Sequence, residues 1–225
     1  MKKVLVNLKM YQTSKEEVEK YINDLKGENV ILFPSFIYLE KYIENGFICG
    51  AQNISTNCVG AYTSEISVKS LKDLNVKYVL IGHSEVRKNF NEKEEDINLK
   101  IKKALEYGLT PVLCVGETLE EYNNQKTKEV IKEKLIKDLD NIKGKVIISY
   151  EPIWAIGTGK IPKKEEIENI VKYIKTLTHQ EVLYGGSVSL DNIENLNQID
   201  VDGFLIGKAG LDVSCLKKII EVVSR

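Results

Sequence analysis

The chain has 225 residues, of which 43% are hydrophobic and 29% charged, so it carries enough apolar material for one large core. Its 32 basic and 33 acidic residues give a formal net charge of −1. That balance argues against a nucleic-acid groove or a membrane-surface role that depends on bulk charge. No apolar run approaches the roughly 18 residues that a membrane-spanning helix needs.

The N-terminal segment and the four cysteines indicate the compartment. The apolar stretch before Asn7 is too short for a secretion signal. The cysteines show no CxxC spacing, and we expect reduced thiols and a cytoplasmic location. They are Cys49, Cys58, Cys114 and Cys215.

Short apolar runs alternate with charged helical patterns along the whole chain. The predicted strands are 3–8, 29–33, 46–52, 77–82, 110–116, 145–151, 181–186 and 201–207. The predicted helices are 14–25, 94–108, 118–139 and 165–177, with shorter ones at 35–44, 67–73, 190–197 and 213–223. Nearly continuous hydrophobic strands are typical of a parallel sheet that is buried on both faces.

This alternation predicts an α/β protein with a single (β/α)8 barrel domain over residues 1–225. The competing architecture is an open doubly wound sheet, which often has a glycine fingerprint after its first strand. Here the first strand ends in NLKMYQTS, which contains no glycine. The barrel is therefore the favoured prediction.

Polar residues end several predicted strands, where a parallel barrel collects its chemistry. They are Asn7 and Lys9 after the first strand, His83 and Glu85 after the fourth, and Glu151 after the sixth. Each of these residues also has an interpretation that involves no catalysis: a surface lysine, a structural histidine or a solvated carboxylate. Together, a carboxylate base, an imidazole kept neutral at a helix start and a cation suit proton abstraction next to a carbonyl.

Glycine-rich turns follow the last three predicted strands. YGGS (184–187) and IGKAG (206–210) each precede an expected helix, and Gly157 and Gly159 follow the sixth strand. Such turns present free backbone N–H groups that suit a phosphate, although a single one is often only a helix-entry turn. The clustering predicts a phosphate-binding site.

Other chemistries find little support in the sequence. The only two histidines lie far apart, and no carboxylate cluster has metal-ligand spacing, so no metal site is expected. No nucleophile elbow, Walker loop or dinucleotide fingerprint occurs.

Eight motifs carry a family resemblance: NLKM (7–10), GAQN (50–53), GAYTSEIS (60–67), IGHSE (81–85), VLCVGE (112–117), YEPIWAIGTGK (150–160), YGGSV (184–188) and DGFLIG (202–207). In these motifs and their order the chain resembles the triosephosphate isomerase family along essentially its whole length. The resemblance implies interconversion of dihydroxyacetone phosphate and D-glyceraldehyde 3-phosphate in glycolysis and gluconeogenesis, without a metal or organic cofactor.

The resemblance also implies residue roles. Glu151 would move a proton between two substrate carbons, and His83 would polarise the carbonyl and shuttle protons between the oxygens. Lys9 would stabilise the enediolate and the phosphate, positioned by Asn7, with Glu85 as a supporting residue behind the pocket.

Backbone N–H groups of Gly157, Ser187, Gly207 and Lys208 would bind the phosphate, with the Ser187 hydroxyl as a further candidate. The stretch 152–162 would be a lid that closes over the substrate and excludes water.

A homodimer is implied as well, with Thr63 reaching the partner's Asn7 and Lys9 region. Some residues depart from the family pattern. Val86 stands where an arginine usually pairs with the glutamate of the dimer loop, and Lys208 replaces a glycine. Pro162 would stiffen the lid or begin the next helix.

Two alternative functions stay open at this point. Another phosphate-binding barrel, such as a sugar-phosphate epimerase, shares the glycine turns but does not explain Lys9, His83 and Glu151 together. A catalytically silent barrel that acts as a binding protein would have lost one of these three residues, and all three are present.

Overall fold

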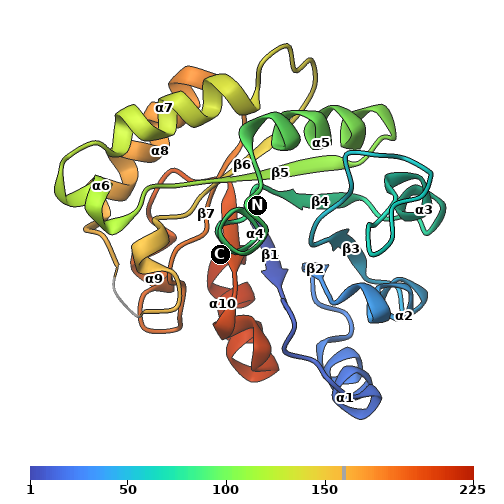
Figure 1. The fold of residues 1–225 in the computed structure, drawn as a ribbon. Coiled ribbons are helices and arrows are strands. Elements are labelled where there is room, and N and C mark those ends of the chain that lie inside the picture. Colours follow the sequence, from blue (N-terminus) through green and yellow to red (C-terminus); the bar gives the residue numbers. More distant parts are fainter. Residues whose placement is uncertain (159–160) are drawn as a thin grey trace.

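The computed structural model describes residues 1–158 and 161–225. Eight parallel strands form a closed barrel in chain order, with β1 paired to β8, as the sequence predicted (Figure 1). The strands are β1 (Lys3–Asn7), β2 (Ile31–Phe33), β3 (Ile48–Ala51), β4 (Tyr78–Ile81), β5 (Thr110–Val115), β6 (Ile147–Tyr150), β7 (Val182–Tyr184) and β8 (Gly203–Ile206).

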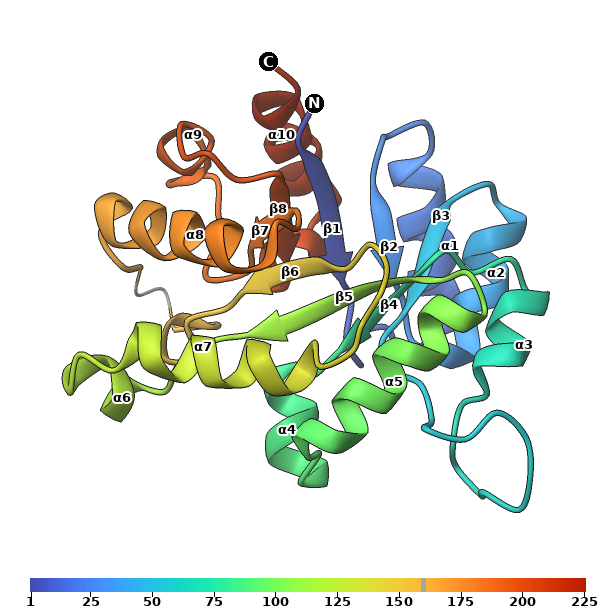
Figure 2. The ribbon, with the colours of Figure 1, turned by 90° about the horizontal axis from the view of Figure 1, so that it is seen from above.

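Helices lie around the outside of the barrel (Figures 1 and 2). They are α1 (Lys15–Leu25), α2 (Leu39–Glu44), α3 (Val68–Asp73), α4 (Ser84–Phe90), α5 (Glu94–Glu106), α6 (Leu119–Asn123), α7 (Thr127–Asp138), α8 (Lys164–Thr178), α9 (Ile193–Leu196) and α10 (Val213–Ser224). Single 3₁₀ turns are η1 (Phe36–Tyr38), η2 (Ile153–Ala155) and η3 (Lys208–Leu211). Among the described residues, no helix combines the length and apolar character needed to cross a membrane.

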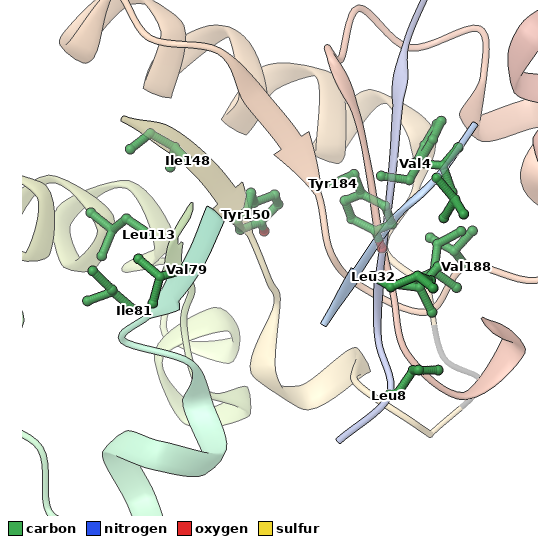
Figure 3. Close-up of a cluster of buried hydrophobic side chains, with 14 of the residues drawn as sticks. Val4, Leu8, Leu32, Val79, Ile81, Leu113, Ile148, Tyr150, Tyr184 and Val188 are labelled. Atoms are coloured by element: carbon green, nitrogen blue, oxygen red, sulfur yellow. The ribbon is translucent and has the colours of Figure 1, made fainter. Parts of the chain in front are cut away.

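Successive strand residues point alternately into the barrel and out toward the helices. On β1, Leu5 belongs to a buried cluster inside the barrel, whereas Val4 and Val6 pack in the layer beneath the helices. Figure 3 shows side chains of this outer layer, among them Val4, Leu32, Val79, Leu113, Ile148, Tyr150 and Tyr184. Because both faces are buried, the strands read as continuous hydrophobic runs.

One local prediction was wrong, and one of the two alternatives for Pro162 is excluded. The helix expected over 118–139 is two helices, α6 and α7, because Gln125 takes a left-handed conformation (φ +58°) between them. Pro162 does not begin the next helix, since α8 starts at Lys164 with Lys163 as its N-cap. Lys160, also part of the predicted lid, lies outside the described residues.

The segment 52–67, between β3 and α3, projects away from the body of the barrel (Figure 2). It contains Thr63, whose side chain is exposed. The segment leaves the same end of the barrel that carries the polar strand ends, because it follows the carboxyl end of β3.

Candidate active site

The carboxyl ends of β1, β4 and β6 bring four predicted residues close together. His83 and Glu151 are both buried, at 6% and 2% exposure, and His83 Nε2 lies 3.9 Å from Glu151 Oε2. Asn7 ends β1 and is also buried, and Lys9 follows it two residues later.

Lys9 is held in a strained backbone conformation. Its φ is +49°, in the left-handed region that side chains other than glycine rarely adopt. The Lys9 N–H donates to Asn7 Oδ1 at 3.0 Å, and the Lys9 carbonyl accepts from Gln52 Nε2 at 2.8 Å. Two side-chain amides therefore fix both polar backbone groups of this residue. The Lys9 ammonium lies 2.5 Å from Glu85 Oε1.

His83 caps the helix that follows it. Its Nδ1 accepts a hydrogen bond from the Glu85 backbone N–H at 3.2 Å, so the proton of the neutral ring lies on Nε2. Nε2 is the nitrogen that faces Glu151. The preceding carbonyl, that of Gly82, accepts from Arg87 Nε at 2.6 Å, which anchors the start of α4.

Glu151 has few fixed partners for a buried carboxylate. Oε1 accepts a long hydrogen bond from Ser149 Oγ at 3.5 Å, and Oε2 has no hydrogen-bond partner among the described residues. A Cβ at Gly185 would lie 2.7 Å from Glu151 Cγ, so only glycine leaves room for the carboxylate there. Burial, together with the nearby Glu151 charge, raises the pKa of the Cys114 thiol.

The segment after Glu151 is tied down through its tryptophan. Trp154 Nε1 donates to Glu117 Oε1 at 2.9 Å, and the Tyr150 hydroxyl donates to the same oxygen at 3.3 Å. Burial raises the pKa of Glu117. The Trp154 ring stacks on Tyr122 of α6 with 4.6 Å between ring centroids. A buried acceptor and an aromatic neighbour thus fix the first part of the predicted lid.

The predicted phosphate residues lie in two turns and the lid. The Ser187 hydroxyl, after β7, donates to the Ala155 carbonyl of η2 at 2.6 Å. Gly207 directly follows β8 and lies beside Lys9, since a Cβ at Gly207 would lie 4.0 Å from Lys9 Cε. Lys208 is exposed and opens η3 outside the left-handed region, so it adds no backbone strain where it replaces a glycine. Gly157 has φ +69°.

The structure brings Asn7, Lys9, His83, Glu85 and Glu151 together and sets the β7 and β8 turns around them. Gly159, also predicted to follow the sixth strand as part of the phosphate site, lies outside the described residues. Residues 1–158 and 161–225 contain no group of three or more His, Cys, Asp or Glu side chains placed to hold a metal ion.

Two functional side chains were missed by sequence reasoning. Gln52 holds the Lys9 carbonyl, and Glu117 accepts from Trp154. Both lie inside motifs that the sequence singled out, GAQN and VLCVGE, so a polar residue directly after an apolar strand was the available signal.

An open groove of about 750 Å³ continues from the site toward the projecting segment. At one end it is lined by Asn7, Lys9, His83 and Glu85. Its other walls come from the segment 64–66 and from α4, where Phe90 is 78% exposed. The groove therefore joins the catalytic candidates to a surface that is partly apolar.

Comparison with known proteins gives one consistent family. A family model described as "Triosephosphate isomerase" matches residues 2–223. The triosephosphate isomerase of Mycoplasmopsis pulmonis (strain UAB CTIP) is 42% identical over 243 aligned residues, which cover 98% of each chain. That of Mesomycoplasma hyorhinis is 50% identical over 177 residues, 76% of this chain and 72% of its own. That of Wolbachia pipientis wMel is 46% identical over 195 residues, 86% and 77% respectively.

Proposed function

The chain belongs to the triosephosphate isomerase family and has its activity, and we propose that Glu151, His83 and Lys9 carry out the reaction. The substrate is a triose phosphate, and the reaction is a step of glycolysis. The observation that carries the proposal is the 3.9 Å separation between the Glu151 carboxylate and the protonated nitrogen of a neutral His83.

Glu151 acts as the base. Its carboxylate takes a proton from the carbon next to the carbonyl of dihydroxyacetone phosphate and returns it to the neighbouring carbon. The unpartnered Oε2 supports this role, because no hydrogen bond has to break before it accepts the proton. A positioned base of this kind contributes roughly 10²–10⁴-fold to the rate.

His83 acts as the electrophile. Its Nε2–H donates to the substrate carbonyl oxygen and stabilises the negative charge that develops there as the carbon loses its proton. The hydrogen bond to Nδ1 supports this role by fixing the tautomer before substrate arrives. His83 then moves a proton between the two oxygens of the enediolate, so the proton count of the enzyme is restored at the end of the cycle.

Lys9 supplies a positive charge for the enediolate and the phosphate, and Asn7 positions it through the 3.0 Å hydrogen bond to its backbone. Glu85 supports the ammonium from the outer side of the pocket. Each proton in this scheme moves between the substrate and a side chain, so the steps require no metal or organic cofactor.

Backbone N–H groups of Gly157, Ser187, Gly207 and Lys208 bind the phosphate. The turn position of Gly207 next to Lys9 supports this assignment, because phosphate and ammonium would then meet. The segment 152–162 is the lid, and it excludes water so that the enediolate does not lose its phosphate.

A second copy of the chain completes the groove beside the site. We assign the segment around Thr63 of one copy to the groove of the other, where it would reach Asn7 and Lys9. The groove's continuity with those residues and the exposed Phe90 at its wall support a homodimer. The glycolytic family and the four free cysteines support a cytoplasmic location.

Turnover of D-glyceraldehyde 3-phosphate, measured before and after exhaustive dialysis against EDTA, tests the proposal. We expect undiminished activity after chelation and a loss of about 10³-fold in kcat for Glu151→Gln, which keeps the side-chain shape and removes the base. Full activity in Glu151→Gln would overturn the assignment of the base, and loss of activity on chelation would overturn the cofactor-independent scheme.

The dimer has a separate test in equilibrium sedimentation. We expect a species of twice the chain mass at micromolar concentration. A monomer under those conditions would overturn the dimer proposal and leave the catalytic assignments in place.

A further inference from the structure

Tyr21 makes a buried contact with the turn that follows β8. It lies on α1, is 6% exposed, and its hydroxyl donates to the Gly210 carbonyl at 2.6 Å. Burial raises the pKa of the Tyr21 hydroxyl, so it stays a proton donor. The contact joins a helix near the N-terminus of the chain to a turn near its C-terminus.

The turn also packs against β1. A Cβ at Gly210 would lie only 2.4 Å from Val6 Cγ1, so the turn packs directly on β1 and only glycine fits. The Gly210 N–H donates to the Gly207 carbonyl at 2.9 Å, which links Gly210 to the first residue of the same turn. The position of the Gly210 carbonyl therefore governs where Gly207 and Lys208 lie.

An aromatic row stands behind Tyr21. Its ring meets Tyr42 edge-on with 6.2 Å between centroids, and Tyr42 meets Phe47 in the same way at 5.9 Å. The Tyr42 hydroxyl donates to Gln12 Oε1 at 2.7 Å, so it is satisfied away from the turn. Because the Tyr21 ring is buried and packed against Tyr42, it has little freedom to move, and its hydroxyl is held in place.

We propose that Tyr21 is a positioning residue for the phosphate end of the substrate. Its hydroxyl fixes the turn from Gly207 to Gly210, and the turn fixes the backbone N–H groups that hold the phosphate. This inference rests on the proposed assignment of Gly207 and Lys208 as phosphate donors. The hydrogen bonds described for Glu151, His83 and Lys9 are made within their own segments and do not involve Tyr21.

The test removes one oxygen atom. In Tyr21→Phe we expect KM for D-glyceraldehyde 3-phosphate and the inhibition constant of inorganic phosphate each to rise about fivefold, the effect of one buried neutral hydrogen bond. We expect kcat to stay within about twofold, because the carbon chemistry is untouched. The slow isomerisation of D-glyceraldehyde, which has no phosphate, should be unchanged.

Tyr42→Phe is the matched control. It removes a buried hydroxyl from the same aromatic row without touching the turn, so its KM should equal that of the wild type. All measurements are made at a temperature at which circular dichroism finds each variant folded.

Two results would overturn the inference. One is an unchanged KM in Tyr21→Phe. The other is an equal loss on D-glyceraldehyde, which would mean that the whole barrel end has shifted. A wild type that phosphate does not inhibit competitively would instead overturn the assignment of the phosphate site.

Discussion

The two halves of the site are held in different ways. At the ends of β1, β3 and β4, side chains fix the backbone, as when Gln52 and Asn7 hold Lys9 and Arg87 holds the carbonyl before His83. At the ends of β6 to β8, the segments are turns held by contacts with one another and with neighbouring helices, such as the Ser187 hydroxyl on Ala155 and Tyr21 of α1 on Gly210.

This difference matches what each half has to do. In the proposed mechanism the first half stabilises charge on the substrate oxygens, and fixed dipoles do this best because they need no reorganisation during the reaction. In the proposed mechanism the second half binds the phosphate and closes over the substrate, so its segments would have to admit and release a ligand. Substitutions in the first half should therefore lower kcat, and substitutions in the loops of the second half should mainly raise KM.

The largest expected effect is an exception to this rule and concerns Glu151, which lies in the second half and is nevertheless the proposed base. Glu151→Asp retracts the carboxylate by one methylene, and a misplacement of about 1 Å costs roughly 10²-fold in rate. We expect kcat to fall by about that factor with KM nearly unchanged. Steady-state kinetics checks this, and an unchanged kcat would remove Glu151 from the mechanism.

The next effect tests the first half through Gln52. Gln52→Met keeps the volume and removes both hydrogen bonds, leaving the Lys9 carbonyl short of a donor at a cost of roughly 1–3 kcal/mol. We expect kcat to fall about tenfold, because Lys9 relaxes from its strained conformation.

Gln180→Met is the control for that change. Gln180 bonds the backbone of Gly144 and Val146, beyond the amino end of β6 and away from the site. The Gln180→Met variant should unfold at a lower urea concentration than the wild type, while its kcat should stay the same. Equal loss of kcat in both variants would contradict the assigned role of Gln52.

A smaller effect concerns the lid. Trp154 is the only tryptophan of the chain, so its fluorescence reports on this segment directly. An aromatic pair is worth about 0.5–1.5 kcal/mol, so Tyr122→Leu should change KM by about two- to tenfold and shift the Trp154 emission to longer wavelength. Tyr122→Phe keeps the stack and loses only the hydroxyl contact to Glu166, so its emission should match the wild type.

The smallest effect is on stability and concerns its dependence on pH. Asp138 is fully buried and accepts from Arg87 at 2.9 Å, beside Glu94 and Lys134. Burial and the Glu94 contact raise the pKa of Asp138 to about 8, while the nearby groups lower the pKa of Glu94. Between the unfolded value of about 4 and 8, the folded chain holds more protons at Asp138 than the unfolded chain, so this contribution to stability falls as pH rises.

We therefore expect Asp138→Asn, which resembles the protonated form, to lose part of this pH dependence. The difference from wild type should not exceed about 1.4 kcal/mol per pH unit, the value for one full proton. Urea unfolding between pH 5 and 8 measures it, to within about 0.5 kcal/mol. Parallel pH curves for both proteins would contradict the raised pKa.

Much of this architecture could be predicted from the sequence, because each strand is a short apolar run and each catalytic candidate directly follows one. The break between α6 and α7 could not, since the charged pattern of 118–139 continues through it while Gln125 turns the backbone. The contacts that support the site residues could not be predicted from the sequence either. Gln52 and Lys9 lie 43 residues apart, and Tyr21 and Gly210 lie 189 apart, so only the folded barrel reveals them as partners.

The barrel closes by pairing β1 with β8, so it can close only after the last strand has been synthesised. Until β8 has been synthesised, β1 and β7 both expose strand edges, and such edges invite pairing with other chains. Contacts between the two ends of a chain close a long loop and are among the slowest to form. Lys9 follows β1 and Gly207 follows β8, so the two residues come together only when these strands pair. We therefore expect a nascent chain that stops before β8 to be both inactive and prone to aggregation, and its ability to bind triose phosphate to arise in the final step of folding.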